Sequence, residues 1–336
     1  MFAYVIKRLI SGFVVLGLIS VAIFLLFWYG PSSPAQPICD RDTSNRCTPE
    51  RLAVFEKSLG YDNPWVEEYG KFVKGVFVGR DISIRSTTYH CSAPCLGISY
   101  RTKNMVFDEM KGRMGATISV AVGGAIMFLA LGVPIGVAAA RRRGTMADKA
   151  LVSTFLVISS VPYYLFALLL WLYVSVVWQI PLISDSGYFS PFKDGPAKWV
   201  GGMLLAWICL GIFFSTAYTR YARGAMVESL SEDYIRTAKA KGLPTRTVVY
   251  KHALRAALVP VVTIFGIDFG TLLAGTIFTE KIFDIHGIGF WGLTAVTGRD
   301  LPVVMATALF AAVMLIVSNI IVDVVYGVLD PRVRLS

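Results

Sequence analysis

Four of the five cysteines, the residues of this chain best able to form covalent or metal bonds, lie in one polar segment: Cys39, Cys47, Cys91 and Cys95. An even number of cysteines outside the cytoplasm favours disulfides, and four cysteines allow three connectivities. We expect the two local pairs, Cys39 with Cys47 and Cys91 with Cys95. A metal site built from His90, Cys91 and Cys95 is the alternative, although the spacing of these residues is loose for zinc. The pattern therefore favours a disulfide-stapled segment without a metal.

The rest of the sequence contains no arrangement typical of an enzyme active site. It has no G-x-x-x-x-G-K-[ST] phosphate-binding loop, no H-E-x-x-H and no G-x-S-x-G. Its three histidines stand far apart, at positions 90, 252 and 286. We therefore expect no catalytic residue and no cofactor on this chain. If ATP powers the protein, ATP and magnesium must be bound by another chain.

One carboxylate stands inside an apolar run, Asp268 in the stretch FGIDFGTLLAG. An unpaired carboxylate is unfavourable near the middle of a membrane helix, so it should face a water-filled path or a partner helix. Two interpretations stay open: Asp268 lines a translocation path, or it is a hydrogen-bonded acid that fixes helix packing. Gly266, Gly270 and Ala274 recur every four residues in the same run, a spacing that lets helix backbones approach closely. We expect a tight helix contact on that face.

The composition is that of a membrane protein. Of 336 residues, 55% are hydrophobic and 16% are charged, and the mean hydropathy is +0.61. A helix needs about 20 apolar residues to cross a bilayer, which predicts an all-α polytopic membrane protein with six transmembrane helices. The six apolar runs cover residues 9–29, 116–140, 151–178, 200–218, 258–278 and 303–328.

The distribution of Lys and Arg predicts the orientation in the membrane. Residues 141–149 and 220–255 are rich in Lys and Arg, whereas residues 179–202 and 280–302 are neutral or slightly acidic. We therefore expect both termini and the basic segments in the cytoplasm. This bias accounts for the net charge of +10, so no nucleic acid partner is needed to explain it. We expect the protein to be surrounded by membrane lipid.

Three domains follow from these runs: an N-terminal transmembrane helix at 1–30, an extracytoplasmic loop subdomain at 31–115, and a core domain at 116–330 with five transmembrane helices. The loop subdomain is large for a connection. Two of its segments, PERLAVFEKSLG and PWVEEYGKFVKGVFVG, each start at a proline, end at a glycine and place apolar residues on one helical face. The residues on these faces are Leu52, Phe55 and Leu59 in the first segment, and Trp65, Tyr69, Phe72 and Phe77 in the second.

A basic cytoplasmic segment at residues 231–257 interrupts the apolar pattern, beginning with SEDYIRTAKAKG. Ser231 is a candidate N-cap, and the two acids after it favour the first turn of a helix. Gly242 can take the left-handed conformation that ends a helix, and Pro244 prevents immediate continuation. We expect a short helix parallel to the membrane with small alanine side chains on its exposed face, then a second helix at 245–257 that leads into the fifth span. Such a helix is suited to sit in a groove of another protein.

This segment resembles the coupling motif, often called the EAA loop, of binding-protein-dependent (type I) ABC importer permeases. YIRTAKAKG, followed nine residues later by HALRAALVP, is similar to the dipeptide and oligopeptide permease B-like branch, in which Arg236, Thr237 and Ala238 replace Glu-Ala-Ala. The resemblance extends over residues 1–335. Further similar stretches are MFAYVIKRLI, GRD, GISYRT, ATISVAVGGAIMFLALGVPIGVAAARRRGTMAD, SVPYYLFALLL, LAGTIFTEKIFDIHGIG and DVVYGVLDPRVR.

The resemblance implies a permease subunit of an ATP-driven peptide importer in the bacterial cytoplasmic membrane. Two such permeases, usually a heterodimer, form the path, an extracytoplasmic substrate-binding protein delivers a peptide, and two ATPase subunits bind ATP. The short helix would sit in a cleft of one ATPase and transmit its closure. The residues implied in this coupling are Asp233, Tyr234, Arg236, Thr237, Ala238, Ala240, Lys241, Gly242, Leu243, His252 and Leu254.

Some features leave alternatives open. His286 stands where the family usually has proline, and the stretches around 39–47 and 82–95 are lengthened, so the docking of a particular binding protein does not carry over. The cargo could also be a nickel chelate, haem or a sugar. A secondary carrier or a channel would need no ATPase and no coupling segment. Replacing Gly242 by a bulky residue should leave the protein folded and inserted but uncouple transport from ATP hydrolysis.

Overall fold

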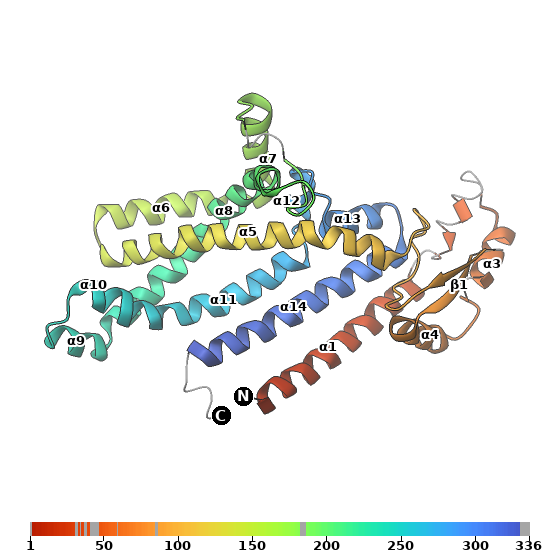
Figure 1. Ribbon diagram of the computed structural model, residues 1–336, viewed down its shortest axis with the longest axis horizontal. Coiled ribbons are helices and arrows are strands. Elements are labelled where there is room, and N and C mark those ends of the chain that lie inside the picture. The colour runs from red at the N-terminus through yellow and green to blue at the C-terminus, as the bar shows by residue number, and fades with distance from the viewer. Residues whose placement is uncertain are drawn as a thin grey trace. The chain divides into compact units, whose positions relative to one another are not determined.

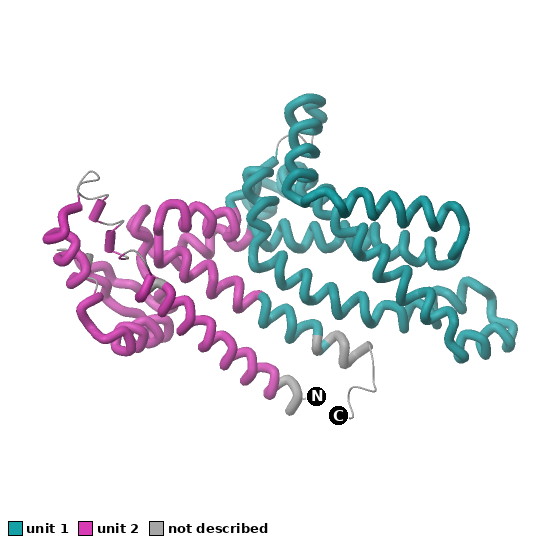
Figure 2. Tube along the Cα trace, turned by 180° about the vertical axis from the view of Figure 1, so that it is seen from behind, with its two compact units in different colours: residues 1–5, 116–286, 315–336 teal, residues 6–115, 287–314 magenta. Residues whose placement is uncertain are grey.

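The computed structural model describes most of the chain, and its residues form mostly helices (Figure 1). They divide into two compact units (Figure 2): unit 1 contains residues 1–5, 116–286 and 315–336, and unit 2 contains residues 6–115 and 287–314. The described residues are 2–30, 33, 35–36, 39–40, 47–58, 60–84, 87–181 and 186–329.

Most helices are long and apolar, and short ones connect them. The helices are α1 (Phe2–Trp28), α3 (Pro49–Ser58), α4 (Trp65–Val78), α5 (Val106–Arg141), α6 (Met146–Ser160), α7 (Tyr163–Trp171), the π-helix η1 (Leu172–Val177), α8 (Pro196–Ser231), α9 (Asp233–Ala240), α10 (Thr245–Thr247), the π-helix η2 (Val248–Ala253), α11 (Leu254–Ala274), α12 (Ile277–Ile282), α13 (Ile288–Thr297) and α14 (Leu301–Leu329).

Five helices within the described ranges are long and apolar enough to cross a membrane, and a bent pair makes up to six. The pair consists of α6 and the stretch Tyr163–Val177, with a bend of 92° between them. The third apolar run, expected at 151–178 as one span, is therefore broken, and as a bent pair it still allows six spans. The break lies at Val161, whose extended backbone (ψ 132°) precedes Pro162, because a residue before proline is driven out of the helical region.

In unit 1, small residues on α5 let α8 approach closely. A Cβ atom on Gly132 would lie 2.7 Å from Cβ of Tyr218, and one on Gly136 would lie 2.7 Å from the carbonyl oxygen of Thr219. Thr219 also donates a hydrogen bond from Oγ1 to the carbonyl oxygen of Gly132 at 3.2 Å. The backbones of two membrane helices can only pack this closely where one side has no side chain.

The face of α11 expected to make a tight contact packs on α14. A Cβ atom on Gly266 would overlap the side chain of Val322, and one on Gly270 would lie 3.0 Å from Cβ of Ser318. Ser318 Oγ donates to the carbonyl oxygen of Gly266 at 2.8 Å. Ala274 ends α11 and is half-buried. The partner of this face is thus a helix of the same chain.

In unit 2, the two expected amphipathic segments form α3 and α4. Phe55 and Phe72 face inward, with 4% and 5% of their surfaces exposed. Phe77 was expected on the same face of α4 as Phe72, but it is 68% exposed. Five residues turn an α-helix by about 500°, which leaves the two side chains about 140° apart. Leu59 lies outside the described residues.

A β-hairpin follows α4, so the expectation of an all-α fold was wrong in this segment. Strands β1 (Arg80–Ile84) and β2 (Thr87–Cys91) pair antiparallel, with Arg80 opposite Cys91. Disulfides join Cys91 to Cys95 and Cys39 to Cys47, the two local pairings expected. The first disulfide takes both sulfur atoms that the alternative metal site needed. His90 instead pairs through Nδ1 with Oδ1 of Asp81 at 2.7 Å.

The turn after the hairpin is fixed on the start of α14 by a buried acid. Asp300 is 3% exposed, and its carboxylate accepts hydrogen bonds from the backbone N–H of Tyr100 at 2.9 Å and of Arg101 at 3.2 Å. The hydroxyl of Ser99 also donates to it. Backbone donors that surround a carboxylate offset its desolvation, so this part of unit 2 has a defined shape.

Candidate functional site

Helix α9 lies at one end of unit 1, together with α10 (Figure 1). It begins after Glu232, the N-cap, and carries Asp233 in its first turn and Lys239 in its last, charges that match the helix dipole. Ser231 was expected to be the N-cap, but it is the last residue of α8 and its Oγ donates to the carbonyl oxygen of Glu228 at 2.7 Å. Helices α8 and α9 therefore meet at Glu232, whose side chain makes no capping hydrogen bond to α9.

The end of α9 is closed by Gly242 as the sequence predicted. Gly242 has φ +77°, its N–H donates to the carbonyl oxygen of Lys239 at 2.9 Å, and the N–H of Leu243 donates to that of Ala238 at 3.3 Å. These are the two hydrogen bonds of a Schellman motif. Apart from the glycine and its chain neighbours, no atom of the described residues lies within 4 Å of the place where a Cβ would be on Gly242, so only its backbone conformation requires glycine.

One face of α9 is anchored in a hydrophobic cluster. Ile235 is fully buried and Ala238 is 8% exposed. Ala238 was expected on the exposed face, but its spacing of three from Ile235 places both on the inward face. The residues buried around them come from α5, α8, η2 and α11: Val137, Ala140, Met226, Val248, Val249, Ala253 and Ala257.

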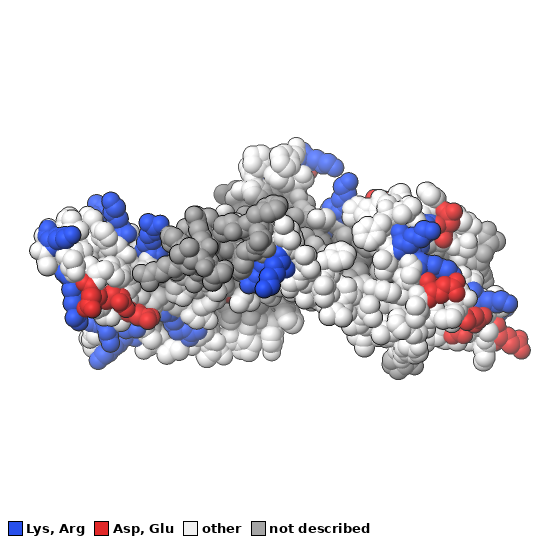
Figure 3. Space-filling view, turned by 90° about the horizontal axis from the view of Figure 1, so that it is seen from below, with Lys and Arg blue, Asp and Glu red and all other residues white. Residues whose placement is uncertain are grey.

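The opposite face of α9 is open to solvent and polar. Tyr234 is 43% exposed, and Arg236 and Asp233 form an exposed ion pair with Nη1 and Oδ1 3.3 Å apart. Lys and Arg side chains gather over this end of unit 1, with a few acids among them (Figure 3). The other exposed residues of this stretch are Thr237, Lys239, Ala240, Lys241, Gly242 and Leu243.

A hydrogen-bonded serine connects the elements beneath α9. Ser229 Oγ lies 2.8 Å from the hydroxyl of Tyr234 and donates to the carbonyl oxygen of Ala253 at 2.9 Å. Ser229 is 4% exposed, so it joins α8, α9 and η2 inside the protein. No motif in the sequence indicated this role of Ser229.

The second part of the segment departs from the expected single helix at 245–257. A short α10 leads into the π-helix η2, in which the N–H of Leu254 reaches the carbonyl oxygen of Val249. A π-helical turn holds one extra residue and often occurs at functional places. His252 and Leu254, both implied in coupling, are half-buried here, and α11 continues through Pro260.

An ion pair next to this region was missed from the sequence. Asp148 is 3% exposed, and its two carboxylate oxygens each lie 2.7 Å from a guanidinium nitrogen of Arg223. The N–H of Gly144 donates to the same carboxylate at 3.0 Å. This bidentate pair joins the first turn of α6 to α8. The pattern Thr145-x-x-Asp148 signalled a capping box, and Thr145 Oγ1 does accept from the N–H of Asp148, but nothing signalled Arg223.

Asp268, the intramembrane acid, contacts a neighbouring helix. Its Oδ2 accepts a hydrogen bond from the hydroxyl of Tyr218 on α8 at 2.9 Å, and the ring of Phe128 lies 4.6 Å from that of Tyr218. The carboxylate is half-buried. This geometry is that of a packing contact, while a role in lining a translocation path stays a prediction.

A second acid in unit 1 was placed wrongly. Glu280 was counted within a neutral-to-acidic connecting loop, but it lies on α12 and is fully buried. Its Oε1 accepts a hydrogen bond from Thr117 of α5 at 2.9 Å, and the preceding Thr279 lies 2.6 Å from the hydroxyl of Tyr163 on α7. Periodicity could not identify α12 because it has only six residues.

Comparison with known proteins identifies related transport proteins along the whole chain. The family model described as binding-protein-dependent transport system inner membrane component matches residues 132–335, and the N-terminal model of such membrane components matches residues 1–121. The chain is 35% identical to the dipeptide transport system permease protein DppB of Escherichia coli strain K12, over 99% of both chains. It is 30% identical to the probable peptide ABC transporter permease protein y4tP of Sinorhizobium fredii, over 98% of this chain and 99% of that one.

Proposed function

Because the chain belongs to the family of binding-protein-dependent transport system inner membrane components, we propose that it is the permease subunit of a bacterial peptide ABC importer, with α9 as the helix that couples it to an ATPase. The names of its relatives, a dipeptide permease and a peptide ABC transporter permease, support peptide as the cargo over a nickel chelate, haem or a sugar. The protein lies in the inner membrane, which it crosses several times.

The architecture of the complex follows from this role. A second homologous permease would complete the translocation path, since a single chain supplies only five or six spans. Two ATPase subunits would lie on the side of α9, which the distribution of Lys and Arg places in the cytoplasm. A substrate-binding protein would deliver the peptide on the other side, where we place residues 31–115. ATP and magnesium would be bound by the ATPase chains.

The anchoring of α9 on one face carries the proposal. Ile235 and Ala238 fix the helix to the ends of α5, α8 and η2, while its polar face is free to contact another protein. A force on the exposed face is therefore transmitted to three helices that continue through the membrane-spanning unit. The Schellman motif at Gly242 ends α9 and so keeps this helix short.

The test is the replacement of Gly242 by valine, with Gly144 as its match. Both glycines have positive φ, +77° and +84°, and both have open space around the Cβ position. A side chain at such a position costs about 1–2 kcal/mol, which lowers the population of the native turn about 5- to 30-fold. We expect Gly242→Val to be inserted normally and to lose peptide uptake by that factor while ATP hydrolysis continues. Gly144→Val, with equal strain in another turn, should keep its uptake. Normal uptake by Gly242→Val would refute the coupling role.

A further inference from the structure

Helix α4 leaves an apolar stripe uncovered on unit 2. Val66 and Phe77 are 59% and 68% exposed, and Gly70 and Val73 lie between them along the helix. At about 100° per residue, these four residues fall within about 60° of the helix circumference. Single exposed apolar side chains are normal on a protein surface, whereas contiguous ones mark a contact with a membrane or another protein.

The exposed valine of the neighbouring helix α3 has different surroundings. Val54 is 67% exposed, as much as the residues of the stripe. Exposed charged residues stand three or four positions from it on the same side of the helix, namely Glu50, Arg51 and Lys57. Val54 is therefore a single apolar residue on a surface made for water, and the stripe on α4 is not.

The apolar span of α1 gives a scale for depth in the membrane. It runs from Ile6 to Leu26. Its 21 residues rise about 31 Å, which matches the roughly 30 Å of a hydrocarbon core. Leu26 therefore marks the hydrocarbon boundary at the end of α1 that leads into residues 31–115. Ser20 precedes Leu26 by six positions and lies about 9 Å inside that boundary.

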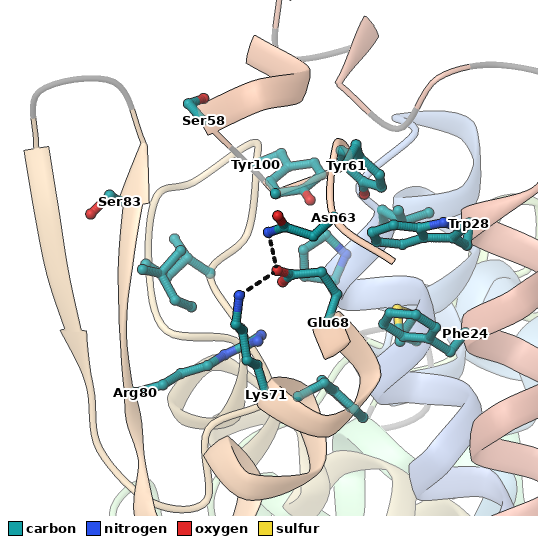
Figure 4. A pocket seen from close by; sticks show the side chains of 18 of the residues that line it. Phe24, Trp28, Ser58, Tyr61, Asn63, Glu68, Lys71, Arg80, Ser83 and Tyr100 are labelled. Carbon is teal, nitrogen blue, oxygen red and sulfur yellow. Dashed lines mark hydrogen bonds and ion pairs between the residues drawn. The ribbon is translucent and has the colours of Figure 1, made fainter. Parts of the chain in front are cut away.

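Helix α4 packs on α1 at this depth. The hydroxyl of Tyr69 lies 3.5 Å from Oγ of Ser20, and the ring centroids of Tyr69 and Phe24 are 5.3 Å apart. Phe24 and Trp28 of α1 point toward α4 and the turn before it (Figure 4). In that turn, the ring of Tyr61 lies 4.8 Å from that of Trp28, and Trp and Tyr are enriched at the level of the lipid headgroups. The start of α4 is therefore level with the headgroups and the acyl chains next to them.

The stripe lies between the face of α4 that packs on α1 and a charged flank. Tyr69 is about 60° from Val66 around the helix on the side of α1, and the exposed Lys74 is about 80° away on the other side. Beyond Lys74, the ion pair of Lys71 with Glu67 (2.9 Å) continues the charged flank. A helix at the edge of a bilayer has this order, because its apolar residues enter the acyl chains while its lysines reach the phosphates.

We propose that α4 is an interfacial helix whose apolar stripe is buried in the phospholipid leaflet on the side of residues 31–115. The occupant follows from α1, whose span exposes Leu18 and Leu26 at 66% and 73%. In a bilayer lipid covers such a surface, and α4 packs on the same span. The contact with lipid holds the hairpin, which starts at Arg80 directly after Gly79, at a fixed height over the bilayer. This role goes beyond the proposed function and is independent of the cargo and of the ATPase.

The test measures the depth of spin labels on the full-length protein in nanodiscs of phosphatidylcholine and phosphatidylglycerol. Each label is attached to one introduced cysteine in Cys209→Ala protein without reductant, because disulfide-bonded cysteines do not react. Collision of the label with oxygen, which concentrates in lipid, is compared with collision with a water-soluble nickel complex. Labels at Val66→Cys and Phe77→Cys should lie about 5–10 Å below the headgroup surface.

Val54→Cys is the matched control, since Val54 is as exposed as Val66 but lies among charged residues of α3. Its label should stay in water, while a label at Leu18→Cys on α1 gives the reading of a lipid-facing position.

Three results would overturn the proposal. Labels at positions 66 and 77 that collide with the nickel complex as often as the label at 54 would place the stripe in water. Little collision with either reagent at 66 and 77 would mean that protein, such as a second copy of this chain, covers the stripe. A label at 54 as deep as the one at 66 would show that the stripe has no special part in the contact with lipid.

Discussion

Replacing Ile235 by alanine should release α9 from unit 1 without unfolding the spans. Ile235 is fully buried, and the change removes three carbons, each contributing about 0.8 kcal/mol when buried. The loss is thus at least about 2.4 kcal/mol, and the cavity left behind raises it toward the 2–5 kcal/mol typical of such changes. An eight-residue helix has little stability by itself. The equilibrium between docked and released α9 should therefore shift by about 50-fold or more.

Hydrogen exchange of the backbone amides, measured by mass spectrometry in detergent, checks this prediction. Peptides covering residues 233–243 should exchange about 50-fold faster in Ile235→Ala, while those from α5 and α8 keep their protection. Ile267→Ala is the control, because Ile267 on α11 is 58% exposed and the same truncation removes little buried surface. Unchanged exchange at 233–243, or an equal loss of protection throughout α5 and α8, would refute the view that Ile235 anchors α9 specifically.

Three further predictions concern other contacts. Arg223→Gln removes the guanidinium from the Asp148 carboxylate and should lower the melting temperature in detergent. Arg223→Gln combined with Asp148→Asn should recover part of this loss, because the two residues act as a pair. Replacing Cys91 and Cys95 by serine should speed proteolysis at the hairpin and leave membrane insertion intact. The loss of stability should be below the roughly 3 kcal/mol of a 15-residue loop, because the two cysteines are only four positions apart in the sequence. Burial raises the pKa of Tyr100 from 10.0 to about 12, so the unfolded phenol loses its proton first and unit 2 should lose stability as pH rises from 10 to 12, which Tyr100→Phe should reduce; an ultraviolet titration that finds all phenols ionising near 10 would contradict this.

Sequence reasoning succeeded where the signal was local. The apolar runs located the long helices, because length and hydropathy alone decide what can cross a bilayer. The helix end at Gly242 was predicted because only glycine adopts positive φ without strain, and the structure shows the two hydrogen bonds of that motif. The cysteine pairings followed in the same way from short separations along the chain.

The burial and pairing of other residues depend on contacts between positions far apart in the sequence. Ala238 faces inward because residues from α5, α8, η2 and α11 form a cluster around it and Ile235, and the residues of α9 alone do not show which elements cover them. The bond between Asp148 and Arg223 joins residues 75 positions apart. Glu280 is fully buried and accepts a hydrogen bond from Thr117, 163 positions earlier in the chain, although a glutamate beside a lysine resembles a surface pair.

The hairpin at 80–91 was missed for a different reason. Its strands have five residues each, and the alternations of polar and apolar residues in them, DISI and TYHC, are only four residues long. The signal that was present is the enrichment in isoleucine, threonine and tyrosine in DISIRSTTYHC. The disulfide at its end, and not a hydrophobic face, is the feature that distinguishes this hairpin.

The most direct test of the coupling role is to find what α9 touches in the native membrane. A photo-crosslinking amino acid in place of Lys239, which is exposed on α9, would be activated in membranes of the bacterium, and the attached protein identified by mass spectrometry. We expect the attached protein to be an ATPase subunit, and we expect Gly242→Val but not Gly144→Val to weaken the crosslink. Attachment to lipid alone or to a protein that binds no ATP, or a crosslink indifferent to Gly242→Val, would contradict it.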